Sequence, residues 1–153
     1  MASKLEAARI ASWSGVPTVI ASAARSGVLT AAAAGQPVGT RFEARRRSLT
    51  ARKLWIAFAA HTAGAIIVDD GARRALVERK KSLLPAGVVS VEGTFVDGDT
   101  VEVRASDGTT FARGMVFVDA AQLRKVMGMQ TRELPEGVVH EVIHRDDLVM
   151  LPA

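Results

Sequence analysis

The chain has 153 residues, of which 48% are apolar and 24% charged, with a formal net charge of +4 and no cysteine. This composition is typical of a globular protein with a hydrophobic core, and it excludes disulfides, thiolate chemistry and cysteine-based metal sites. No apolar run approaches the roughly 20 residues that span a bilayer, and the first ten residues lack the apolar segment of a signal peptide. We therefore expect a cytoplasmic protein that makes no contact with a membrane.

The basic charge is concentrated in the first part of the chain. Residues 1–62 contain nine Lys and Arg against two acidic residues, whereas residues 63–153 contain eleven against fourteen. The basic residues are densest between Arg45 and Lys53. Such a stripe raises the affinity for any polyanion without specifying which one, and a solvated linker is the alternative interpretation.

The first 50 residues predict alternating helices and strands. Residues 3–13 predict an alanine-rich helix, in which Ser3 is the N-cap, Glu6 completes a capping box and Gly15 ends the helix. Residues 17–21 are apolar and β-branched, which predicts a strand buried on both faces. Residues 27–34 predict a second helix that ends at Gly35, and residues 38–43 predict a second strand.

This alternation is typical of a layered α/β fold, but the segment supplies too few strands for a complete sheet. An isolated pair of strands is marginally stable in water, so we interpret residues 1–50 as the end of a larger α/β domain. Residues 51–62 predict a connecting segment. Within it, residues 51–59 predict an amphipathic helix with Leu54, Trp55 and Phe58 on its apolar face.

Residues 63–153 predict a small β-rich domain. We expect strands at 65–68, 88–95, 100–104 and 110–118, and a last strand at 140–144 or 148–151. Two helices are expected between them. The first covers 69–80 and is capped by Asp69 or Asp70, and the second is capped by Asp119, runs to Val126 and closes at Gly128. The Asp-Gly pairs at 97–98 and 107–108 predict tight turns. The whole chain is therefore expected to be α+β, with a truncated α/β tail followed by a small, partly closed β pseudo-barrel with short helices.

The titratable residues give no catalytic or metal site. His140 and His144 have a spacing that suits one face of a helix, but the pattern around them favours a strand, with the histidines either structural or exposed to a partner. The neighbouring carboxylates Asp69–Asp70 and Asp146–Asp147 would point to opposite faces of a strand, so turn and cap roles are expected. No P-loop, glycine fingerprint or Ser/His/Asp arrangement is present.

The start of the first helix is the one candidate binding site. A helix that begins at Ser3 and Lys4 presents free backbone N–H groups, the positive end of its dipole and an ammonium group. These groups together suit an anion such as phosphate.

Several segments of the chain resemble one enzyme family. Residues 1–8, MASKLEAA, resemble the end of the nucleotide motif GTGGMxTK-L-x-A-A, with Ser3 where the family usually has Thr. The other matching segments are GVPTVIA at 15–21, PVGT at 37–40, RKLWI at 52–56, VDDGA at 68–72, SLLPAG at 82–87, GDTV at 98–101, LRKVMG at 123–128 and HRDDL at 144–148. Together they resemble bacterial glutamate 5-kinase along essentially the whole chain.

This resemblance implies the end of an amino-acid-kinase domain followed by a PUA domain, a small pseudo-barrel also found in RNA-modifying enzymes. The intact parent would transfer the γ-phosphoryl group of ATP to the side-chain carboxylate of glutamate, with Mg²⁺, in the first step of proline biosynthesis. Met1, Ala2, Ser3 and Lys4 would contact the nucleotide phosphates of that parent. Because the chain starts inside the motif, we expect it to be inactive alone, with no catalytic residue and no cofactor of its own.

Two other functions are compatible with the sequence. The PUA-like domain could bind RNA, but its acidic balance and its few aromatic residues do not favour this. Phe95, Phe111 and Phe117 stand at strand positions where core packing is expected. The domain could instead serve regulation or assembly, and a homo-oligomer is compatible with the open edge of an incomplete sheet.

Overall fold

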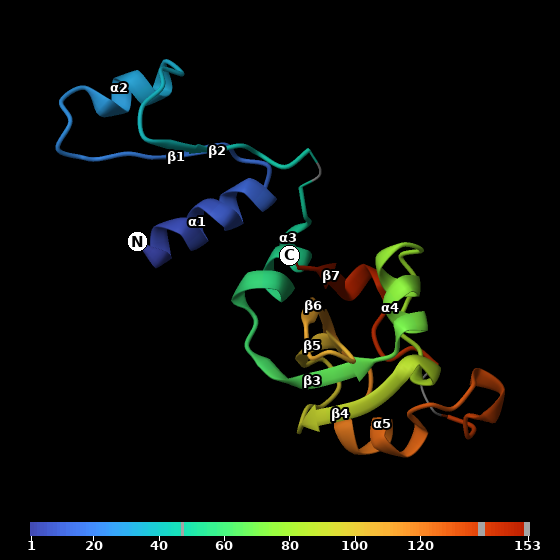
Figure 1. The fold of residues 1–153 in the computed structure, drawn as a ribbon. Coiled ribbons are helices and arrows are strands. Elements are labelled where there is room, and N and C mark those ends of the chain that lie inside the picture. Colours follow the sequence, from blue (N-terminus) through green and yellow to red (C-terminus); the bar gives the residue numbers. More distant parts are fainter. Residues whose placement is uncertain (47, 138–139, 152–153) are drawn as a thin grey trace. The chain divides into compact units, whose positions relative to one another are not determined.

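A computed structural model describes residues 1–46, 48–137 and 140–151 (Figure 1). The chain divides into two compact units between Leu54 and Trp55. This division falls within residues 51–62, while the domain boundaries drawn from the sequence stay predictions. Within the described ranges, no helix is long and apolar enough to cross a membrane.

The first unit contains a two-stranded sheet and short helices. Its elements are α1 (Ala2–Trp13), β1 (Thr18–Ile20), α2 (Val28–Ala33), β2 (Thr40–Phe42) and α3 (Ala51–Leu54). β1 and β2 pair in antiparallel fashion, with Val19 opposite Arg41. The predicted order of helix, strand, helix and strand is confirmed. Gly15 ends the first helix with a φ of +81°, a conformation that glycine adopts without strain.

Two details predicted for this unit are wrong. The capping box does not form, because α1 begins one residue earlier than predicted, with Met1 as its N-cap and no capping side chain. Ser3 therefore lies inside the first turn, where its hydroxyl cannot act as an N-cap. The strand around Val19 is only half-buried along its length, because β2 is its one paired neighbour in the described part of the chain.

The second unit is built on a five-stranded sheet, whose strands are labelled in Figure 1. Its strands are β3 (Thr62–Val68), β4 (Val88–Gly93), β5 (Thr100–Ala105), β6 (Thr110–Met115) and β7 (Leu148–Met150), in the spatial order β4-β3-β5-β6-β7. β3 and β5 are parallel, and the other pairs are antiparallel. The last strand thus forms in the second of the two predicted places. Ile143, in the first place, makes an isolated bridge to Leu83.

Local signals position the helices and turns of this unit as predicted. Asp69 caps α4 (Asp70–Val77) by accepting a hydrogen bond from the backbone N–H of Ala72 at 2.7 Å. Asp119 caps α5 (Ala120–Val126) by accepting from Gln122 at the same distance. Each cap satisfies a backbone donor that the first helical turn leaves unpaired. The predicted Asp-Gly turns are confirmed, with positive φ at both glycines.

One hydrophobic core holds the second unit together. Its members come from the strands, both helices and the segment before β7; the fully buried side chains include Ile66, Leu76, Leu83, Phe95, Val101, Val103, Val116, Leu123, Val142 and Ile143. α5 also covers β4, an outer strand of the sheet. There the Arg124 guanidinium donates to the carbonyl oxygen of Gly93 at 2.6 Å, which occupies an acceptor that would otherwise be open to another strand.

The predicted apolar face of the connecting helix is wrong. α3 ends at Leu54, and residues Trp55–Ala59 form a π-helix, in which the N–H of Ala60 donates to the carbonyl of Trp55. The wider winding of a π-helix rotates the side chains relative to α-helical spacing. Ile56 and Ala57 are consequently buried, whereas Trp55 is 48% exposed.

A network of charged side chains joins three strands of the sheet. Arg104 on β5 donates to Glu102 at 2.8 Å and to Glu92 on β4 at 2.8 Å. Arg113 on β6 lies 3.7 Å from Glu102 and donates to the carbonyl of Ala57 at 3.0 Å. The hydrogen bonds from Arg104 are the largest cause of a lowered pKa of Glu102, and burial opposes this effect.

This lowered pKa predicts how the stability of the second unit depends on pH. A carboxylate with a depressed folded-state pKa stabilises the fold above its unfolded pKa, and this contribution is lost as the pH falls through the folded pKa. We therefore expect the Glu102→Gln variant to lose less stability than the parent chain between about pH 5 and pH 2. Urea unfolding at several pH values measures this difference. Glu78→Gln, at an exposed site, is the control, and an equal flattening by both variants would contradict the prediction.

Candidate functional site

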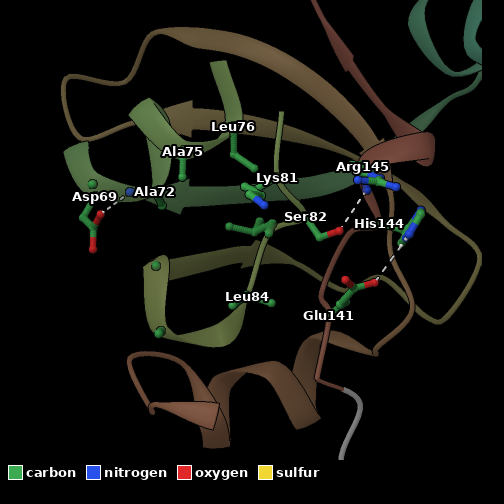
Figure 2. Close-up of a pocket in the computed structure, with 14 residues that line it drawn as sticks. Asp69, Ala72, Ala75, Leu76, Lys81, Ser82, Leu84, Glu141, His144 and Arg145 are labelled. Atoms are coloured by element: carbon green, nitrogen blue, oxygen red, sulfur yellow. Dashed lines mark hydrogen bonds and ion pairs between the residues drawn. The ribbon is translucent and has the colours of Figure 1, made fainter. Parts of the chain in front are cut away.

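A pocket of about 710 Å³ opens beside helix α4 in the second unit (Figure 2). Its walls come from α4, from the turn between α4 and β4, and from the segment before β7. The lining residues are Asp69, Gly71, Ala72, Ala75, Leu76, Lys81, Ser82, Leu83, Leu84, Ala86, Gly87, Glu141, His144 and Arg145. A volume of this size is typical of small-molecule sites.

The floor of the pocket is apolar. Leu76 and Leu83 are almost fully buried, and Ala72 and Ala75 add small side chains along α4. Gly87 allows the turn to approach this helix closely, since a Cβ atom at position 87 would overlap the Cβ of Ala72. The small side chains at these positions therefore leave space in the pocket although the turn and α4 lie close together.

Polar groups gather at one end of the pocket. The Ser82 hydroxyl oxygen accepts a hydrogen bond from the backbone N–H of Arg145 at 3.1 Å, although the two residues are 63 positions apart. His144 accepts from the N–H of Asp146 through Nδ1 at 3.2 Å, while its Nε2 lies 3.9 Å from Glu141. Figure 2 shows Lys81 between Asp69 and this polar end.

The two acidic groups of the lining already have partners within the fold. Asp69 is used by the α4 cap, and Glu141 faces the imidazole of His144. Lys81 forms no ion pair with any residue in the described ranges. The lining has no activated nucleophile and no pair of groups arranged for acid–base catalysis. An apolar floor with polar groups at one end is suited to binding a small ligand.

The residues predicted to contact phosphate lie elsewhere, at the start of α1 in the first unit. Met1, Ala2, Ser3 and Lys4 are all exposed. The N–H of Lys4 donates to the carbonyl of Met1 at 3.2 Å, and α1 runs on for twelve residues. A helix start with a lysine in its first turn keeps the electrostatic character that the sequence indicated.

The structure bears on two further sequence patterns, the histidines and the basic stripe. The described part of the chain has no group of three or more histidine, aspartate or glutamate residues arranged to hold a metal ion. In the basic stripe, the Arg45 guanidinium lies 3.8 Å from the ring centroid of Trp13. This arginine therefore packs on an aromatic ring of its own unit.

Aromatic side chains of the second unit are mostly engaged in packing. Phe95 is 2% exposed, which confirms its predicted core role. Phe111 packs against the core while the Arg73 guanidinium lies 5.5 Å from its ring, and Phe117 is half-buried. Trp55 is the more accessible aromatic side chain.

Sequence reasoning missed the pocket, even though two of its segments were already noted. SLLPAG contains Ser82 and HRDDL contains Arg145, and both contributed to the family resemblance. The two segments are joined by the pairing of Leu83 with Ile143, which forms only in the folded chain.

Similarity to known proteins extends over nearly the whole chain. Residues 64–138 match the PUA domain family. A glutamate 5-kinase of Mycolicibacterium smegmatis is 47% identical over 149 residues, which cover 97% of this chain and 40% of that protein. A glutamate 5-kinase of Streptomyces avermitilis is 46% identical over 155 residues, covering 99% of this chain and 40% of that protein. The chain is homologous to the C-terminal part of glutamate 5-kinase.

The chain spans about 40% of the length of these glutamate 5-kinases. Most residues that line the pocket lie within the stretch that matches the PUA domain family, whereas Glu141, His144 and Arg145 follow it. A solved PUA domain from Aeropyrum pernix, determined as a tartrate complex, is 32% identical with a TM-score of 0.44. That match covers 61% of this chain and 50% of the solved chain. The match to the PUA domain family and the observed helices and strands confirm the α+β fold expected for this chain.

Proposed function

We propose that this chain is the C-terminal part of a protein that phosphorylates the side-chain carboxylate of glutamate with ATP, in the first step of proline biosynthesis. The observation that carries the proposal is the 47% identity to a named glutamate 5-kinase across 97% of the chain. RNA binding and regulation or assembly by the PUA domain are the alternatives. The packed phenylalanines argue against RNA, because readers of RNA usually offer accessible stacking rings.

In the whole protein, Met1, Ala2, Ser3 and Lys4 would contact the phosphates of ATP. The exposed start of α1 supports this role, since the positive end of a helix dipole and the Lys4 ammonium both favour an anion. The chain's own residues would thus position the nucleotide, and ATP would supply the phosphoryl group.

The chain by itself would have no turnover. Phosphoryl transfer needs several charged groups and a metal ion around the γ-phosphate at once, and α1 offers a single lysine near its start. The residues of the first unit do not fit Mg²⁺. Its acidic residues are Glu6 and Glu43, and Glu43 is paired with Arg41 at 2.7 Å.

Two assays test this proposal. The chain alone, given ATP and glutamate, is expected to release no ADP above background in a coupled assay. A chimera that joins it to the remaining part of the Mycolicibacterium smegmatis relative is expected to restore ADP release. In that chimera, Lys4→Met should lower kcat/KM by about a hundredfold, because it removes a positive charge from the phosphate site.

Arg9→Met is the matched control, since Arg9 is another exposed basic residue on α1. Turnover by the isolated chain would contradict the proposed dependence on the rest of the protein. A folded chimera without glutamate-dependent ADP release would contradict the kinase assignment, and equal effects of the two variants would remove Lys4 from the nucleotide site.

A further inference from the structure

We infer that the pocket beside α4 binds a small carboxylic acid, as a monoanion with a compact apolar body. This site belongs to the second unit and does not depend on the proposed kinase activity. Three features of the lining favour such a ligand: its charge balance, one hydroxyl group and its apolar floor.

The charged residues of the lining favour a ligand with a single negative charge. Asp69 is held by the backbone of α4, and Glu141 faces His144, so neither acid is directed to neutralise Lys81. The Lys81 ammonium lies between these two ends of the pocket, as Figure 2 shows. Arg145, the other strong cation of the lining, already has a partner within the fold. Lys81 is the lining cation left without an ion pair among the described residues, and one such ammonium suits a monoanion better than a dianionic phosphate, because each additional charge taken from water needs a partner of its own.

Ser82 provides a directed hydrogen-bond donor beside this lysine. Its oxygen accepts the N–H of Arg145, which fixes the orientation of the hydroxyl group and leaves its own hydrogen to donate. Among the described residues the Ser82 hydroxyl donates to no partner that would compete with a ligand. A carboxylate can accept from this hydroxyl and from Lys81 at the same time, through its two oxygens.

The apolar floor indicates what kind of body the ligand carries beside its carboxylate. Leu76, Leu83, Ala72 and Ala75 offer an apolar surface without a hydrogen-bonding group, which favours a short aliphatic body. No phenylalanine or tryptophan is among the described lining residues, so a nucleobase would find no aromatic ring to stack on. The pocket therefore favours a small aliphatic acid over the end of an RNA strand.

Amide NMR spectra of the full chain, titrated with isovalerate, test this inference. Isovalerate should cause saturable shifts at the amides of Ser82, Arg145 and α4, with a dissociation constant on the order of millimolar, as expected for so few atoms. Isovaleramide has the same shape without the charge, and it should bind at least about threefold more weakly.

Variants distinguish binding in the pocket from a general effect of positive surface charge. Lys81→Gln should weaken isovalerate about threefold, since an exposed ion pair contributes modestly. Lys125→Gln removes an exposed lysine of α5 outside the pocket and should leave the affinity unchanged. Ala75→Leu should fill the floor and abolish the saturable shifts, with the unchanged spectrum of the sheet as evidence of folding.

Four outcomes measured with small ligands would overturn the inference. These are the absence of saturable shifts in the pocket, equal binding of isovalerate and isovaleramide, an unchanged affinity in Lys81→Gln, and tighter binding of inorganic phosphate at the same amides. A single-stranded RNA that shifts these amides at far lower concentration would assign the pocket to nucleic acid instead. Because none of these experiments involves ATP, failure here leaves the kinase proposal standing.

Discussion

Replacing Phe95 by alanine is expected to lower the free energy of unfolding of the second unit by about 4 kcal/mol. The Phe95 side chain is 2% exposed within the core, and its carbonyl also accepts from the N–H of Ala120 at the start of α5. Truncation removes the buried ring and leaves a cavity that rigid strands cannot fill by relaxation. The loss can be measured from the hydrogen exchange of the β5 amides, which report global opening of this unit.

Phe117→Ala is the matched control for this prediction. Its ring is only half-buried, so the same change of side chain should cost clearly less. Equal losses from the two variants would contradict the assignment of Phe95 to the centre of the core.

Replacing Gly64 by alanine is expected to destabilise the second unit by about 3 kcal/mol. An added Cβ would overlap the carbonyl oxygen of Glu92 on β4 and would lie 3.1 Å from Cδ1 of Phe95. Because the overlap is with backbone, relief requires β3 and β4 to move apart, which strains the hydrogen bonds of the sheet. Urea unfolding followed by circular dichroism measures the loss.

Gly108→Ala gives a comparison in which only backbone conformation matters. Gly108 has a φ of +84° and open space where its Cβ would be, so the left-handed conformation alone should cost about 1 kcal/mol. If Gly64→Ala were no more harmful than Gly108→Ala, close approach of the two strands would not be the reason for glycine at position 64.

Features that depend on residues a few positions apart are the ones that the sequence predicts most accurately. A cap at Asp69 or Asp70 and a cap at Asp119 are predictable from the sequence, because a cap depends on a carboxylate and a backbone N–H three residues away. The structure assigns the first of these caps to Asp69. The failure at Ser3 has the same local origin, since a shift of one residue at the helix start removes the cap geometry. The π-helix around Ile56 was missed because residue spacing was interpreted with the α-helical period.

The sequence by itself determined the helix caps of the second unit to within one residue, its glycine turns, its first four strand segments and the family resemblance to glutamate 5-kinase. Only the tertiary structure decided the order of the strands and the pocket, where Leu83 pairs with Ile143 and Ser82 meets Arg145 across 63 positions. The physical reason is that caps and turns are stabilised within a few residues, whereas this pocket exists only after the core has closed. Local patterns therefore identified its segments without bringing them together.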